Sequence, residues 1–503
     1  MTGISVLSAL VVAVLVLPAA GALVLLLAGQ RADAWAQRFG VVVTAAALAV
    51  SVALAAGFDR ADPRRLQGVI DTAWVPQLGL RFHLGVDGIS LPLVVLTTLL
   101  TALCAAYTVR HLPDPGRPRA LVGLLLLLEV GLLGTFLAQD LLLFFVFFEV
   151  VLAPMYFVIA VWGGHGRVRA ATTFILYTVL GSVVMLLGFL LVWARTGTTD
   201  FVLLSERGGA GMSRTVQLVA ILAIGVGLAV KAPMWPLHSW LPDAHTAAPT
   251  VGSVLLAGVL LKMGTYGMVR IAVPVLPQGA SAVAPYLGAL GVVGIVYGSL
   301  ACLAQRDLKR LVAFSSVGHM GFVLLGIATL TPIGLNGALY ANVAHGVITG
   351  LLFFLVGGVK DRYGTTDLGE LPRSLYARAP RLGGLVALAA VASLGLPGLA
   401  GFWGEFLAMA GAFRPAAGLH RSLFLVLLGL AAAGTVLTAY YLLRVVRRVD
   451  QGDGTGPPVR DVDAAEATAW LPLAALAVLL GVLPGVLLGL SDPVVTGLLG
   501  VGR

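Results

Sequence analysis

Seven ionisable side chains lie inside long apolar runs of this sequence, where a charge is costly. They are Glu129, Glu149, Lys231, Lys262, His319, His345 and Glu405. A charged side chain near the centre of a bilayer costs about 2.5–3.5 kcal/mol. Ionisable groups in such positions usually mark ion or proton paths, and all seven can gain or lose a proton. These residues therefore predict a series of proton-exchanging groups.

The choice of base supports proton exchange over fixed charge. The chain has 28 arginines and only four lysines, yet Lys231 and Lys262 are the basic residues deep in apolar runs. An arginine cannot lose its proton in a protein, whereas a buried lysine can. A site that needed only a fixed positive charge could have used the commoner arginine.

Two other interpretations stay open. Glu149 and Lys231 could form a static buried ion pair, with the histidines as satisfied core residues. His238 and His245 lie in Pro236-Leu-His-Ser-Trp-Leu-Pro-Asp-Ala-His. They could form a mouth or switch of the path, or they could satisfy unwound backbone.

Composition identifies the elements that must position these residues. Of the 503 residues, 59% are hydrophobic and only 11% are charged. Ordinary soluble domains have about 25% charged residues. The chain is therefore predicted to be an all-α integral membrane protein, which excludes soluble enzymes, nucleic-acid-binding proteins and disordered proteins. Apolar runs of bilayer-crossing length predict about fourteen transmembrane helices, at 4–28, 38–57, 89–110, 118–138, 140–162, 168–194, 215–245, 250–272, 281–303, 309–329, 335–359, 381–413, 420–447 and 468–490.

Helices 7 and 12 are predicted to be discontinuous. Lys231-Ala-Pro233-Met-Trp-Pro236 interrupts one, and Leu396-Pro397-Gly-Leu-Ala-Gly401 interrupts the other. Proline removes a backbone donor, and broken helices line polar sites in transporters built from inverted repeats. Lys231 and Glu405 lie beside the two breaks, 174 residues apart. A shift of about this many residues along the sequence aligns helices 4–8 with helices 9–13. This alignment predicts two inverted five-helix repeats.

The predicted organisation has four parts: helices 1–3 (1–117) with an external loop at 58–88, a first repeat that holds a proton half-channel (118–272), a second repeat (281–447), and a C-terminal helix (468–503). Residues 450–463 are predicted to be a polar linker, and the loop at 58–88 to hold a β-hairpin, followed by a helix start at Asp87-Gly-Ile-Ser90. Odd-numbered loops carry nineteen basic residues and even loops with the C-terminus carry eleven. Odd loops are therefore expected in the cytoplasm and both termini outside.

Motifs for redox cofactors and metals are absent from the sequence. There is no Walker A loop and no dinucleotide fingerprint, and Cys104 and Cys302 are too few for an iron–sulfur cluster. No cofactor or metal is expected in this chain. It can move ions but cannot by itself carry electrons.

The motifs around these residues resemble the antiporter-like subunits of respiratory complex I, NADH:quinone oxidoreductase. Leu143-Phe-Phe-Val-Phe-Phe-Glu149-Val-Val-Leu-Ala-Pro154 is similar to the fifth-helix motif of that family. The stretch from Lys231 to His245 and Lys262-Met-Gly-Thr-Tyr-Gly resemble its seventh and eighth helices, and Ser315-Ser-Val-Gly-His319 and Gly404-Glu405-Phe complete the match. The resemblance covers nearly all of the chain, and the form of the lysine segments is closest to the subunit M (chain 4) branch.

The resemblance implies roles for single residues. Glu149 would pair with Lys231 and modulate its pKa, and Lys262, His319 and His345 would form a central axis. Glu405 would end that axis beside a neighbouring subunit, and Glu129 matches the fourth-helix glutamate of the family.

The function implied is proton translocation in the membrane arm of a bacterial complex I. NADH, FMN, iron–sulfur clusters and quinone would be bound by partner subunits, and the neighbours in the inner membrane would be L-type and N-type antiporter-like subunits. The alternative is the D-type component of a multisubunit Na⁺/H⁺ (cation/proton) antiporter.

Overall fold

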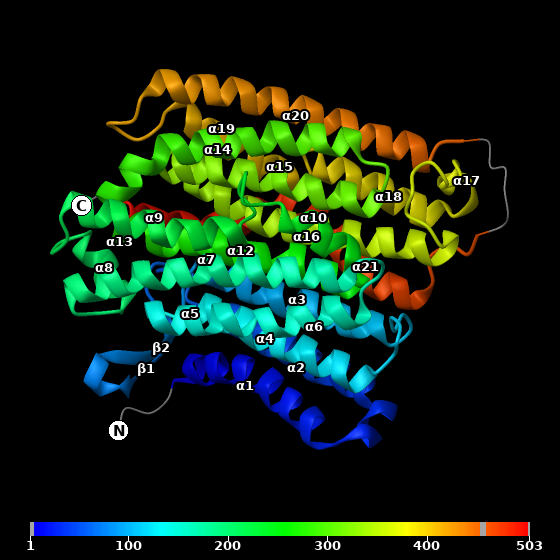
Figure 1. Ribbon diagram of the computed structural model, residues 1–503, viewed down its shortest axis with the longest axis horizontal. Helices are drawn as coiled ribbons and strands as arrows, with labels where there is room; N and C mark the ends of the chain where they lie inside the picture. The colour runs from blue at the N-terminus through cyan, green and yellow to red at the C-terminus, as the bar shows by residue number, and fades with distance from the viewer. Residues whose placement is uncertain (1–4, 453–458, 501–503) are drawn as a thin grey trace.

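The computed structural model describes residues 5–452 and 459–500. Within these residues, thirteen helical segments are long and apolar enough to cross a membrane. They run side by side along the long axis of the molecule (Figure 1). Their bounds are α1 (Val6–Leu27), α2 (Ala36–Gly57), α3 (Ser90–Thr108), α4 (Pro118–Leu137), α5–α6 (Leu141–Trp162), α7 (Arg167–Thr196), α9 (Arg214–Lys231), α11–α13 (Thr250–Val275), α14 (Pro277–Ala304), α15 (Leu308–Ala328), α16 (Pro332–Tyr363), α20 (Arg421–Val449) and α21 (Ala464–Val482).

The remaining predicted span is broken, as expected. It consists of α18 (Pro380–Ser393) and α19 (Ala400–Phe413), two half-length helices separated at Pro397. The seventh span is also broken, because α9 ends at Lys231 and a short α10 (Trp240–Ala247) resumes after the two prolines. The prediction of an all-α membrane fold with discontinuous helices 7 and 12 is confirmed.

The C-terminal helix differs from its prediction at 468–490. It begins earlier, at Ala464, and ends at Val482, and a separate α22 (Gly485–Leu498) follows. Pro484 explains the turn, because a residue that precedes proline is driven out of the helical region. Leu483 has φ −119° and ψ 62°. The predicted polar linker at 450–463 lies partly outside the described residues.

The predicted β-hairpin is present. β1 (Gln67–Val75) pairs antiparallel with β2 (Leu80–Val86), around the short 3-10 turn η2 (Pro76–Leu78). The Asp87 carboxylate then accepts hydrogen bonds from the backbone N–H groups of Ile89 and Ser90, at 3.0 Å each, and starts α3. The expected helix start is therefore confirmed. Short helices connect other spans: η1 (Gln30–Ala34), α8 (Phe201–Arg207) and α17 (Leu375–Arg378).

One local structure occurs twice, in agreement with the predicted repeats. Asp140 begins α5 and forms an isolated β-bridge with Asp200, and Asp307 begins α15 and forms one with Asp367. In each case the first aspartate also accepts a hydrogen bond from a threonine beside the second. The first bridge precedes α8 and the second precedes α17, which lie at opposite ends of the molecule (Figure 1). The two copies of this structure therefore have opposite orientation along the long axis.

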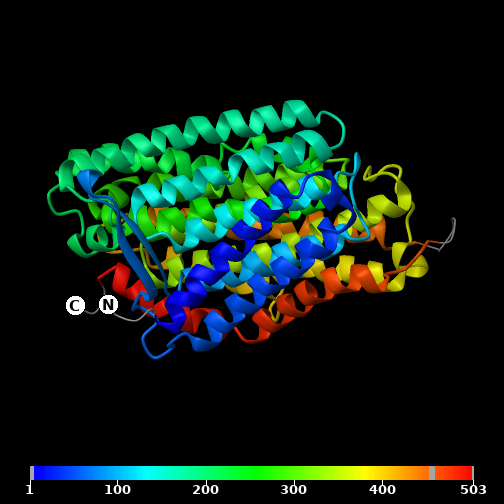
Figure 2. The ribbon, with the colours of Figure 1, turned by 90° about the horizontal axis from the view of Figure 1, so that it is seen from below.

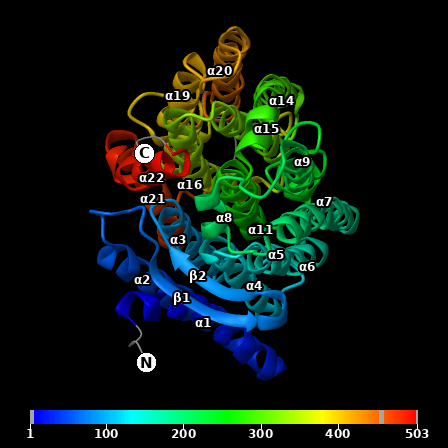
Figure 3. The ribbon, with the colours of Figure 1, turned by 90° about the vertical axis from the view of Figure 1, so that its left-hand side faces the viewer.

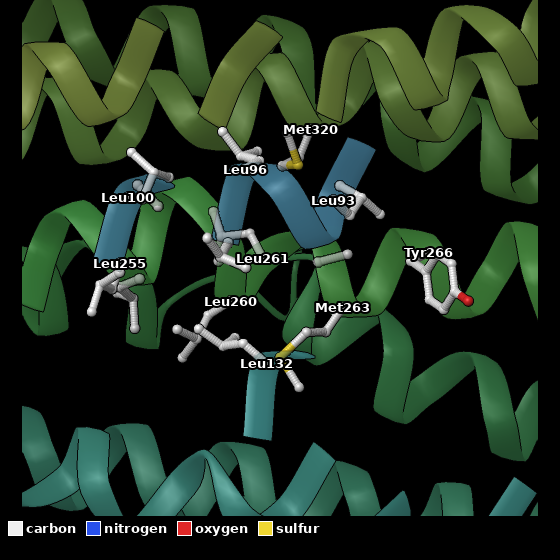
Figure 4. Packing of buried hydrophobic residues seen from close by; sticks show 14 of the residues in the cluster. Leu93, Leu96, Leu100, Leu132, Leu255, Leu260, Leu261, Met263, Tyr266 and Met320 are labelled. Atoms are coloured by element: carbon white, nitrogen blue, oxygen red, sulfur yellow. The ribbon is translucent and has the colours of Figure 1, made fainter. Parts of the chain in front are cut away.

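The eighth span, Thr250–Val275, forms the centre of the core and is completely buried. Figure 4 shows Leu93, Leu96 and Leu100 of α3 packed beside Leu255 and Leu261 of this span. Two π-helical segments, η3 (Leu256–Leu260) and η4 (Met268–Ala272), interrupt its α-helical turns. Single π turns occur frequently at functional sites. The sequence did not predict them.

Both ends of the described chain lie at one end of the molecule (Figures 1 and 2). Figure 3 looks onto that end, where the hairpin, α8 and α22 lie across the helix ends. The loop that contains α17 lies at the other end. This arrangement agrees with the expectation that both termini are on the same side of the membrane.

Candidate functional site: a buried series of titratable residues

Lys231 is the last residue of α9, and only 1% of it is exposed. Its ammonium group lies 4.6 Å from the centre of the Phe148 ring and has no hydrogen-bond partner among the described residues. The C-terminal end of a helix carries partial negative charge and favours a cation. The break after α9 thus leaves a buried ammonium group at a helix end, without the fixed partners of a structural ion pair.

Glu149 lies in the last turn of α5 and is half-buried. It interacts electrostatically with Lys231, but no ion pair within 4.0 Å joins the two among the described residues. One Glu149 oxygen is buried without a partner. The direct pairing implied by the resemblance is therefore not present in this arrangement, and a water molecule or a side-chain movement must connect the groups.

Lys262 lies in the first turn of α12 (Leu261–Gly267), directly after the first π segment, and is fully buried. Its Nζ atom lies 2.5 Å from the carbonyl oxygen of Ala257, in that π segment, and 2.6 Å from Nδ1 of His345 on α16. In such a hydrogen bond the ammonium donates to a neutral imidazole, or an imidazole N–H donates to a neutral amine. The pair can therefore hold its proton on either partner.

His319 and Glu405 form the second pair. His319 Nδ1 lies 3.1 Å from a Glu405 oxygen, and its Nε2 lies 3.0 Å from the Ser393 hydroxyl. These residues come from α15, α19 and α18, so the break between α18 and α19 brings both halves of helix 12 to one histidine. A carboxylate beside an imidazole can exchange a proton with it and stabilise its charged form.

A small cavity connects the two pairs. It has a volume of about 20 Å³ and is lined by His319, His345, Thr349, Ser393 and Glu405, among others. A cavity needs about 10–15 Å³ to hold one water molecule. His345 Nε2 and the Thr349 hydroxyl have no partner among the described residues. The imidazole ring centres are 5.6 Å apart, so one water could connect the two histidines.

Close helix packing places Lys231 near the eighth span. A Cβ atom on Gly264 would lie 2.8 Å from the backbone nitrogen of Ala232, the residue after Lys231. Only glycine therefore lets the eighth span approach the end of α9 this closely. The two lysines lie on neighbouring helices.

The two histidines after the first break have different surroundings. His245, on α10, is fully buried, stacks on Phe353 with ring centres 4.6 Å apart, and interacts electrostatically with Lys262 and Lys309. Both of its ring nitrogens are unpartnered among the described residues. His238 instead lies against Tyr297 of α14, with ring centres 4.9 Å apart. The structure thus brings His245 toward the lysines, whereas His238 faces another helix.

Glu129 is not brought into the series. It lies on α4 with no exposed surface, and neither of its carboxylate oxygens has a partner among the described residues. No interaction with another titratable side chain is found for it in the described chain.

Two buried basic residues were missed at the sequence level, where they were counted as loop residues. Lys309, in the first turn of α15, donates a hydrogen bond to the carbonyl of Ala248. Arg270, in the second π segment, forms an ion pair of 2.7 Å with Asp87. Both residues lie within or at the edge of a predicted span, and this position was the signal in the sequence that could have identified them as buried. Their burial depends on tertiary packing.

The chain is similar in sequence to known proteins of one family. Residues 138–433 match the family described as NADH:quinone oxidoreductase/Mrp antiporter, transmembrane region. This range contains every candidate residue named from the sequence except Glu129. NADH-quinone oxidoreductase subunit M of Rhodobacter capsulatus is 40% identical over 499 residues, which is 96% of this chain and 94% of that protein. NAD(P)H-quinone oxidoreductase chain 4 1 of a Synechococcus strain is 45% identical over 388 residues, 76% of this chain and 71% of its own length.

Solved structures show the same fold. A chain of respiratory complex I from Thermus thermophilus superimposes with a TM-score of 0.87 at 31% identity, with 98% of this chain and 99% of that chain covered. A chain of the Mrp complex from a Dietzia strain superimposes with a TM-score of 0.86 at 24% identity, with 99% and 98% covered. The second likeness, at this identity, establishes the fold alone.

Proposed function

The chain belongs to the NADH:quinone oxidoreductase/Mrp antiporter transmembrane family, and from this premise we propose that it is a proton-translocating membrane-arm subunit of an NADH:quinone oxidoreductase. The observation that carries the proposal is the pair of buried hydrogen-bonded couples, Lys262 with His345 and His319 with Glu405, separated by a cavity of about 20 Å³.

The proposed path runs through the chain in one order. A proton moves between Lys231 and the Lys262–His345 couple, crosses the cavity by one water molecule, and reaches His319 and Glu405. Glu149 biases the charge on Lys231, and that lysine has no fixed ion pair with any described residue, which leaves it free to change its protonation state. His245 is the candidate entrance, because it interacts electrostatically with both Lys309 and Lys262.

Electron transfer takes place in partner subunits under this proposal. NADH, FMN, iron–sulfur clusters and quinone are bound there, and this chain receives the released energy as a change in its buried charges. The neighbours are L-type and N-type antiporter-like subunits in a bacterial inner membrane, and both termini face outward.

Membership of an NADH:quinone oxidoreductase is favoured over an Mrp-type antiporter by sequence similarity. The identity is 40% with the subunit M of Rhodobacter capsulatus and 31% with the chain of the Thermus complex I, against 24% with the chain of the Mrp complex.

The deciding experiment is to purify the assembly with an affinity tag on this chain and to identify the subunits that accompany it. Subunits with NADH- and quinone-binding activity are expected. Purification with small antiporter subunits alone, and sodium-driven proton movement without NADH oxidation, would reject the proposal.

A further inference from the structure

A large basic cavity lies at the α17 end of the molecule, away from the titratable series. Its volume is about 860 Å³, and five arginines line it with a single acidic residue, Asp367. The arginines are Arg306, Arg373, Arg444, Arg447 and Arg448. Three separate segments supply them: the turn after α14, the loop before α17, and the last turns of α20.

The positive charge of the cavity is only partly offset within the described chain. None of the five arginines forms an ion pair within 4.0 Å with a described carboxylate. Arg448 donates to the carbonyl oxygens of Leu371 and Gly369, and it interacts electrostatically with Arg373, which repels it, and with Asp367, which attracts it. Like charges held together around a cavity favour binding of an anion.

The nearby acidic groups are already engaged. Asp367 accepts a hydrogen bond of 2.6 Å from the N–H of Gly369, and Asp307 accepts from Thr366 and from the N–H of Arg310. The β-bridge between these two aspartates fixes the loop wall against the start of α15. The cavity is therefore a formed site whose walls are held by hydrogen bonds.

An apolar surface of the kind that contacts lipid continues from the cavity along α20, because Tyr440 of this helix lines the cavity. Val436, Tyr440 and Leu443 of α20 are exposed by 53–69%. They have helical spacing and occupy one face. That face lies opposite Thr438, whose hydroxyl is 3.3 Å from the Ser299 hydroxyl of α14, and α20 lies at the periphery of the bundle (Figure 3).

We propose that this cavity binds the phosphate head group of an anionic phospholipid, with its acyl chains along the exposed face of α20. Arginine guanidinium groups pair with phosphate oxygens through two parallel hydrogen bonds. Basic pockets at the cytoplasmic ends of membrane helices bind anionic head groups. The cavity lies at the end predicted to be cytoplasmic, and the lipid-facing apolar strip distinguishes a phospholipid from a soluble phosphate compound.

The first experiment counts lipids in the purified whole complex by native mass spectrometry. The double variant Arg373→Gln/Arg447→Gln should retain at least one anionic phospholipid fewer per complex than the wild type. The control is Arg31→Gln/Arg169→Gln, which removes two exposed arginines from the same predicted face outside the cavity. Equal lipid loss in both double variants, or none in the first, would overturn the proposal.

A second experiment uses the unmodified complex, so it does not depend on how the variants fold. Phenylglyoxal labels accessible arginines, and peptide mass spectrometry reports the labelling of Arg373 and Arg447. Vesicles with phosphatidylglycerol should protect both residues severalfold, whereas pure phosphatidylcholine vesicles and inorganic phosphate should not. Equal protection by inorganic phosphate would assign the cavity to a soluble anion, and no protection by any of them would reject an anion site; either result overturns the lipid assignment.

Discussion

At the scale of single residues, the chemistry depends on bases that can lose a proton. Lys231 and Lys262 are buried, yet neither has a carboxylate within ion-pair distance among the described residues. Lys262 instead shares a hydrogen bond with an imidazole. A static charge pair would have the opposite geometry, with each ammonium group fixed against a carboxylate. The arrangement therefore favours proton exchange by the two lysines over a static ion pair.

We expect Lys231→Arg to assemble but to pump poorly, because the guanidinium keeps its proton at every relevant pH. The loss should be about tenfold or more, since proton transfer by a positioned side chain contributes about 10²–10⁴-fold. The measurement is NADH-driven proton uptake by inverted membrane vesicles. Normal pumping by this variant would show that the position requires only positive charge.

Glu149 and Lys231 should act as one unit. Glu149→Gln should impair pumping strongly, because the carboxylate that biases Lys231 is lost, and Glu149→Asp should impair it only in part. The double variant Glu149→Gln/Lys231→Met should be hardly worse than either single variant, because residues in one network are not additive. If the two single losses multiply in the double variant, the residues work independently.

The cavity between the histidines offers a test of the water step. Ala344 lines it, and Ala344→Val would add two methyl groups where about 20 Å³ is free. We expect pumping to fall while assembly is retained, although overpacking costs about 1–3 kcal/mol of stability. Ala344→Ser, which is almost the same size, is the control and should pump normally. Full activity of the valine variant would exclude an essential water at this position.

At the scale of helices, the sequence predicted the features that have a local cause. The prolines after Lys231 and at Pro397 remove backbone donors at the two breaks, and Asp87 starts α3 by accepting two N–H groups. The direct contact of Lys262 with His345 could not be predicted, because 83 residues separate them and helix packing decides their distance. The π segments of the eighth span have no comparable local signal.

The end of α20 carries a pH-sensitive element outside the membrane-spanning segments. Burial raises the pKa of the Asp450 carboxyl to about 7. A carboxyl group in an unfolded chain has a pKa of about 3.9. At a pH between these two pKa values, the folded chain therefore binds more protons than the unfolded chain. The stability that the protonated Asp450 contributes is fully present below about pH 4 and is lost as the pH rises toward 7.

Asp450→Asn should remove this dependence. We expect the variant to raise the unfolding temperature of the chain in the complex more at pH 8 than at pH 5. In the wild type, the free energy of unfolding should fall by at most about 1.4 kcal/mol per pH unit between about pH 4 and pH 7. A stabilisation that is equal at the two pH values would mean that Asp450 does not titrate in this range.

At the scale of the whole molecule, the orientation in the membrane remains a prediction from the basic loops. The structure places the hairpin and the described chain ends at one end, and the loop around α17 at the other. Single cysteines at Thr72, on β1, and Arg169, at the start of α7, should report the two sides, because both positions are exposed. The native Cys104 and Cys302 are buried.

An impermeant thiol reagent added to intact cells should label the cysteine at position 72 and spare the one at 169. After permeabilisation both should react. Labelling of position 169 alone in intact cells would reverse the orientation and place the arginine cavity outside.

The central claim is that protons pass through the buried series of this chain. The most direct measurement is NADH-driven proton uptake by inverted vesicles that contain the Lys262→Met variant. Lys360→Met is the matched control, since Lys360 is exposed and outside the series. We predict that Lys262→Met assembles fully and loses most of its proton uptake, about tenfold or more, while Lys360→Met pumps like the wild type. Wild-type uptake by a fully assembled Lys262→Met complex would contradict the proposed path.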